Sequence, residues 1–154
     1  MENLANTNIT RSLGSGLAGA IALTALHETV RQFVPEAPRA DLLGMRAIAK
    51  GYQKAGEQPP SEDKLYPMAM VGDIASNALY YSLLGTYSKR PILTGTALGL
   101  LAGIGAVVLP GPMGLGEKPT KRTTATAAMT IGWYLFGGLV AGALYDRLRQ
   151  PTTA

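Results

Sequence analysis

Two short stretches of polar residues stand within otherwise apolar sequence and are the candidates for chemistry. The first is the run from His27 through Glu28 to Arg31, and the second pairs Asp73 with Asn77. Residues three or four apart share one face of a helix, so each stretch presents its polar groups together. A histidine can exchange a proton near neutral pH, and a carboxylate within a membrane needs a cation, a proton or water beside it. These residue types fit a proton or cation path, or an ion-paired cluster that fixes helix packing.

The same residues complete none of the common catalytic or metal-binding motifs. The string HETVR resembles the zinc motif H-E-x-x-H, but Arg31 stands where the second ligand would be, and His27 is the sole histidine. The chain has no cysteine, which excludes thiolate metal sites and a cysteine nucleophile. It also has no G-x-S-x-G motif and no P-loop. We therefore predict a protein that is not an enzyme and that carries no metal or cofactor.

The elements that must position these residues are unusually apolar. Charged residues make up 16% of the 154 residues, while the set A, V, I, L, M, F, W, Y and C makes up 47%, and the apolar residues gather in four blocks, at about residues 13–34, 66–87, 91–113 and 123–146. Each block is close to the roughly 20 residues with which a helix crosses a bilayer. The helices of a soluble bundle, which is the alternative, would show a charged face. The sequence predicts one all-α domain, an integral membrane four-helix bundle.

The connection between the first two blocks favours a short amphipathic helix at about residues 41–51. Asp41 is a candidate N-cap, because its carboxylate can accept from the first N–H groups, and Gly51 could end the helix. Apolar residues alternate there with Arg46 and Lys50. Such a helix lies on the membrane surface or across the end of the bundle, or else it is a solvated connector.

The polar residues of the first two blocks are expected to meet. His27 precedes the end of its block by about the length of helix that separates Asp73 from the start of the next, so antiparallel neighbours would hold both at one level. The predicted intramembrane polar cluster comprises His27, Glu28, Arg31, Asp73, Asn77 and Tyr80. A conduction path and a structural plug are both consistent with it.

Aromatic residues indicate depth in the bilayer. Tyr66 and Tyr87 bracket the second block, and their separation of roughly 31 Å along a helix suits the two aromatic belts of a membrane. Trp133 and Tyr134 fall near the middle of the fourth block, where we expect them to pack against neighbouring helices.

Glycines recur at a spacing of one helical turn. The third block carries Gly95, Gly99 and Gly103, and the fourth carries Gly138 and Gly142. Glycines four apart form a face on which another backbone can approach closely. We expect these five glycines to be helix-packing residues, either within the bundle or between copies in an oligomer.

The distribution of charge bears on partners and orientation. A net charge of +4 with scattered basic residues gives no indication of nucleic-acid binding; the lipid bilayer is the expected surrounding. Four spans would place Arg11, Lys89, Arg90, Arg147 and Arg149 at one end and Arg39, Arg46, Lys50, Lys54, Lys64, Lys118, Lys121 and Arg122 at the other. The positive-inside rule then favours a cytoplasmic first loop, with both termini outside.

A family resemblance is carried by about thirty residues: the glycines of GLAG at 16–19, then Glu28, Pro35, Pro38 and Arg39. In these features the chain resembles YagU-type proteins, which implies a small multi-pass protein of the bacterial inner membrane. We expect a non-enzymatic assembly or accessory subunit that packs, through its glycine faces, with itself or a larger membrane complex. The alternative is a small transporter or a proton- or cation-conducting protein that uses His27 and Asp73.

Overall fold

The computed structural model describes residues 2–87 and 89–150, with side chains for residues 8–86 and 89–150, and this part of the chain is helical without a strand. In chain order, the elements are α1 (Glu2–Val30), α2 (Ala40–Lys54), α3 (Glu62–Ser82), the 3₁₀ helix η1 (Leu83–Tyr87), α4 (Pro91–Val108), α5 (Lys118–Lys121) and α6 (Thr124–Arg149). The all-α prediction is confirmed for these residues.

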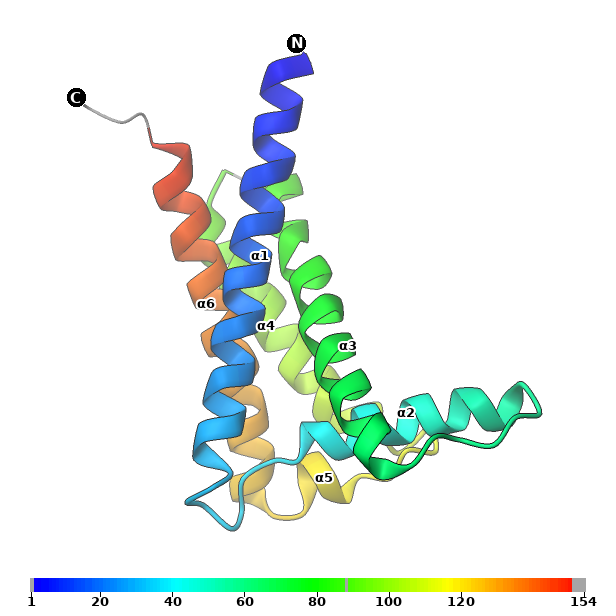
Figure 1. Ribbon diagram of the computed structural model, residues 1–154. Coiled ribbons are helices and arrows are strands. Elements are labelled where there is room, and N and C mark those ends of the chain that lie inside the picture. The colour runs from blue at the N-terminus through cyan, green and yellow to red at the C-terminus, as the bar shows by residue number, and fades with distance from the viewer. Residues whose placement is uncertain (1, 88, 151–154) are drawn as a thin grey trace.

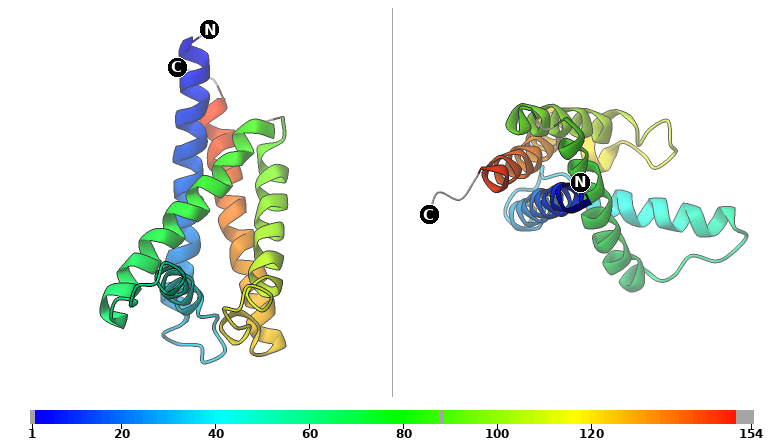
Figure 2. Two further views of the ribbon diagram at one scale, coloured as in Figure 1. Left: turned by 90° about the vertical axis from the view of Figure 1, so that its right-hand side faces the viewer. Right: turned by 90° about the horizontal axis from the view of Figure 1, so that it is seen from above.

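Four long helices run alongside one another, and α2 lies across one end of them (Figure 1). The most extensive contact joins α4 to α6, and α1 packs against both α3 and α6. α2 contacts α3 and projects sideways from the bundle, as Figure 2 shows. The start of α1 and the end of α6 lie at the end of the bundle opposite α2. The core between the long helices includes Leu23, Tyr81, Leu84, Ala141 and Tyr145, all nearly inaccessible to solvent.

Within the described residues, three helical segments are long and apolar enough to cross a membrane: Asn8–Val30, Pro91–Val108 and Thr124–Arg149. Their outward faces carry large apolar side chains, for example Ile21, Leu101 and Phe136. Burying such surface in hydrocarbon removes it from water without a protein partner. α3 has sufficient length, but Asp73, Asn77 and three tyrosines make it less apolar.

The helix bounds differ from the sequence prediction in ways that follow from local residues. α1 begins at Glu2, well before residue 13, because the polar sequence there continues the helix without a breaker. It ends at Val30, short of 34, and a turn precedes Pro35. α4 ends at Val108 and not at 113, because Pro110 lacks the N–H that would extend a helix. α5 was not predicted.

The amphipathic segment is a helix, α2, but its ends are set differently from the prediction. Asp41 lies inside the first turn, no side chain caps the helix, and the Asp41 carboxylate binds Arg39 instead. Gly51 lies within the helix, which runs on to Lys54. Gly56 follows with φ of +79°, a left-handed conformation that glycine adopts without steric cost. Gly56 is therefore the residue that turns the chain away from α2.

Candidate functional site

The glycines of α4 and α6 set the framework of the site by bringing two backbones together. Gly95, Gly99 and Gly103 are buried on α4. A Cβ atom on Gly99 would lie 2.6 Å from the Tyr134 carbonyl oxygen, and one on Gly103 would lie 2.7 Å from the Ile131 Cα atom. Gly95 meets Gly138 and Gly142 in the same way. The structure thus places all five predicted glycines in one contact between helices of a single chain.

Thr24, Asp73 and Asn77 form a polar group, here called the inner group, in which Asp73 on α3 is the central acceptor. The Thr24 hydroxyl of α1 donates to Asp73 Oδ2 at 3.2 Å. One turn further along α3, the Asn77 amide donates to Asp73 Oδ1 at 3.0 Å. Each carboxylate oxygen therefore has a neutral donor, and the bond from Thr24 joins α1 to α3.

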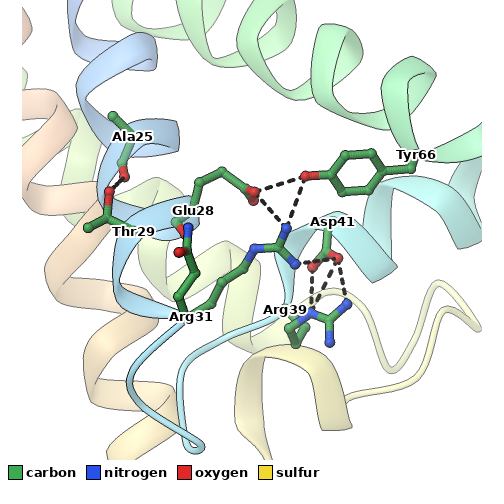
Figure 3. A network of polar contacts seen from close by, with 8 residues as sticks. Ala25, Glu28, Thr29, Arg31, Arg39, Asp41 and Tyr66 are labelled. Carbon is green, nitrogen blue, oxygen red and sulfur yellow. Dashed lines mark hydrogen bonds and ion pairs between the residues drawn. The ribbon is translucent and has the colours of Figure 1, made fainter.

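A second, outer group is built around Arg31 just beyond the end of α1 (Figure 3). Its guanidinium pairs with Glu28 Oε2 at 2.6 Å and donates to the Tyr66 hydroxyl oxygen at 3.0 Å. The Tyr66 hydroxyl in turn donates to Glu28 Oε2 at 2.8 Å. Tyr66 is thus fixed at the start of α3 by two ionised groups, while the side chain of Tyr87, the other predicted belt residue, lies outside the described side chains.

Asp41 extends the outer group to α2. Its carboxylate is 3% exposed and pairs with Arg39 at 2.7 Å and with Arg31 at 3.4 Å. Burial alone would raise the pKa of the Asp41 carboxyl, but the hydrogen bond from Arg39 and the charges of Arg39 and Arg31 outweigh it, so the pKa lies below its ordinary value. Asp41 and Arg39 were not predicted as members, because Asp41 was considered only as a local helix cap.

His27 belongs to neither group. It is 5% exposed, and its Nε2 has no hydrogen-bond partner among the described residues. Its ring packs edge-on against Trp133 of α6, with 4.7 Å between ring centroids, and lies 6.2 Å from the ring of Tyr134. The expectation of one continuous cluster is therefore corrected: α1 turns His27 toward α6, whereas Thr24, one turn earlier, reaches Asp73.

Two adjacent tyrosines of α3 tie this helix to the rest of the bundle. The Tyr80 hydroxyl donates to the Leu98 carbonyl of α4 at 3.0 Å, so Tyr80 lies apart from the Asp73 group. The Tyr81 side chain is fully buried, and its hydroxyl donates to the Tyr134 carbonyl of α6 at 2.7 Å. Sequence reasoning missed Tyr81 because the polar stripe of α3 favoured its neighbour.

A cavity of about 290 Å³ lies beside Asp73. Its walls come from α2 and α3, with Tyr134 of α6 contributing, and consist of Ala40, Leu43, Gly44, Ala47, Ile48, Ala69, Gly72, Asp73, Ser76 and Tyr134. Within the described part of the chain, Asp73 forms no ion pair with a basic residue. The cavity thus presents one carboxylate, two hydroxyls and otherwise apolar walls, and its acidic group is open to a cation or a proton.

The described residues contain no group of three or more His, Asp or Glu side chains that could hold a metal ion. Comparison of the chain with models of known families, with curated proteins and with solved structures found no match.

Proposed function

We propose that the chain is a four-helix integral membrane protein in which α3 is the fourth spanning helix. The outward face of α3 supports this, because Val71 is 68% exposed and Leu79 is 62% exposed. On the opposite face, Asp73 accepts hydrogen bonds from Thr24 of α1 and from Asn77 of α3 itself. These polar groups are thus turned away from the apolar outer face, as they are in spanning helices. We also propose the bacterial inner membrane as the location, which is the expectation drawn from the features that residues 16–39 share with YagU-type proteins.

Within that architecture, we propose that Asp73 binds a small cation or a proton on its way through the protein, as in a small transporter or conducting protein. The single observation that carries this function is the Asp73 carboxylate, which borders a cavity without a basic partner among the described residues. An ionised carboxylate near hydrocarbon is costly unless a cation, a proton or water accompanies it. The open cavity gives access to such a species.

The outer group favours a structural role, by contrast. Glu28 and Asp41 both have arginine partners, so their charge is already balanced. The glycine face of α4 does not favour a role in assembly with other chains, because α6 of the same chain already covers it. Association with other copies or with a larger membrane complex would therefore use surfaces other than these glycine faces.

The test is ion flux into proteoliposomes that contain the purified protein. A pH gradient, and separately a potassium gradient, is imposed across vesicles loaded with an indicator dye, and the rate is compared with that of empty vesicles. We expect Asp73→Asn to reduce the protein-dependent rate at least tenfold while leaving the helical circular dichroism signal and the particle mass unchanged. Asn keeps the size of the side chain and removes its charge.

Glu28→Gln is the matched control, because it removes one carboxylate from the same end of the bundle without touching the cavity. It should keep at least half of the wild-type rate if it folds. A wild-type rate equal to that of empty vesicles for both gradients would refute the function. So would an Asp73→Asn protein that folds and conducts like the wild type.

A further inference from the structure

A second pocket, of about 210 Å³, opens between α2 and α5 and is lined by four basic side chains and no acidic one. Arg39 precedes α2, Arg46 lies on α2, and Lys118 and Arg122 belong to α5 and the residue after it. The remaining wall is apolar and includes Ala37, Leu42 and Pro119. Like charges gathered around one concave space repel one another unless an anion neutralises them.

Hydrogen bonds between distant segments hold three of these four basic residues in place. The backbone N–H of Arg39 donates to the Pro119 carbonyl at 2.8 Å. Arg46 Nη1 donates to the Leu115 carbonyl at 2.8 Å, and the Arg122 guanidinium donates to the Pro35 carbonyl. A guanidinium has five N–H donors, so the single bonds of Arg46 and Arg122 leave most of their donors for a ligand. The pocket is therefore positioned before any ligand arrives.

Among the described residues, only Arg39 of these four basic side chains has a carboxylate partner. Asp41 is engaged by Arg39 and Arg31, and Glu117 lies 3.7 Å from Lys121, which is not a lining residue. Lys118 forms no ion pair with any residue in the described ranges. Arg46, Lys118 and Arg122 thus present positive charge with no acidic partner to one small volume.

We propose that this pocket binds a phosphate group. Arginine binds phosphate oxygens through paired N–H donors and lysine adds a point charge. The position favours the headgroup of an anionic lipid as the source. The pocket is lined by residues of α2 and α5 and their flanks, and these two helices lie at the end of the bundle where α1 and α4 end and α6 begins (Figure 1). This choice of source depends on the chain being a membrane protein, whereas the phosphate chemistry does not.

The test uses the full chain in a neutral detergent, with bound lipid measured by native mass spectrometry. Phosphatidylglycerol is titrated first, then phosphatidylcholine, and inorganic phosphate is added as a competitor. We expect phosphatidylglycerol to bind at least tenfold more tightly than phosphatidylcholine. The double variant Arg46→Gln and Lys118→Gln should bind phosphatidylglycerol at least tenfold more weakly than the wild type.

The control variant, Lys54→Gln with Lys64→Gln, removes the same charge from the same end of the bundle but outside the pocket, and its affinity should stay within twofold of the wild type. The single variant Lys118→Gln separates binding from folding, because among the described residues its side chain makes no ion pair. It should weaken binding at least threefold with unchanged thermal stability.

The competition identifies the source of the phosphate. Phosphatidylglycerol binding that resists inorganic phosphate supports a lipid headgroup, and full displacement at comparable concentration supports a soluble phosphate in the same pocket. Wild-type affinity in the double variant would overturn the proposal. An equal loss in the control variant would overturn it as well, since general surface charge would then explain the binding.

Discussion

Gly99 on α4 and Tyr134 on α6 meet through their backbones, so that a Cβ atom on Gly99 would lie 2.6 Å from the Tyr134 carbonyl oxygen. Tyr134 is also the residue of α6 that borders the Asp73 cavity and whose carbonyl accepts from Tyr81. The close approach of α4 to α6 thus helps to position Tyr134, the part of the cavity wall that α6 contributes. In lipid, the hydrophobic effect does not drive apolar helices together, because acyl chains are as apolar as the helices. Close packing of this kind therefore provides much of the stability of helix association.

Gly99→Ala should destabilise the protein by about 1–3 kcal/mol, because the added methyl group forces two backbones apart. Thermal unfolding of the purified protein in detergent, followed by circular dichroism, measures the change. Gly105→Ala on the same helix is the control, since its Cβ would lie 3.4 Å from Leu109 Cδ1, a flexible side-chain atom. Equal melting temperatures for Gly99→Ala and the wild type would contradict the tight α4–α6 contact.

Tyr81→Phe should cost about 1 kcal/mol of stability, because it removes the buried hydrogen bond of 2.7 Å between the Tyr81 hydroxyl and the Tyr134 carbonyl. Shape and apolar contact are preserved. Tyr52→Phe makes the same chemical change on α2, where the structure gives the hydroxyl no hydrogen bond to a described residue, and should have little effect. The melting temperatures of the two variants check this, and a larger loss for Tyr52→Phe would contradict the assignment.

Protonation of the Asp41 carboxylate should make the protein less stable in acid. Its pKa is lower in the folded protein than its ordinary value, because the Arg39 hydrogen bond and the arginine charges outweigh the effect of burial. Its contribution is therefore fully present above about pH 4, the pKa of an unpaired aspartate, and is lost as the pH falls through the lowered value. Melting temperatures of the wild type and Asp41→Asn, measured between about pH 2 and pH 7, should converge in acid. A difference that does not shrink toward low pH would refute this role.

Much of the architecture could be predicted from the sequence, because it depends on local patterns. The apolar blocks indicated α1, α4 and α6 at membrane-spanning length, and the glycines at 95, 99 and 103 indicated a face for close helix contact. Trp133 was expected to pack within the bundle, and it lies against His27. Each of these depends only on the length of an apolar run or on which residues share one helix face.

The site could be predicted only in part, because it also depends on how helices are rotated about their axes. Depth alone placed His27 level with Asp73, but the rotation of α1 directs Thr24 toward Asp73 and His27 toward Trp133. Asp41 was considered a local cap, whereas its carboxylate also pairs with Arg31, which follows α1 and is distant in sequence from the start of α2. The basic pocket was not predicted, because α5 was not expected. Lys118 of α5 and Arg46 of α2 line the same pocket only in the folded chain.

The most direct test of whether α3 crosses the membrane and carries Asp73 into it uses two single-cysteine variants. The chain has no cysteine, so Gln58→Cys before α3 and Lys89→Cys after it each introduce the sole thiol. Each variant is labelled with a membrane-impermeant maleimide, first in intact vesicles of known orientation and then after permeabilisation. Four spans predict that one of the two positions reacts in intact vesicles and the other only after permeabilisation. Reaction of both positions from the same side would contradict the four-helix membrane protein and the proposed role of Asp73.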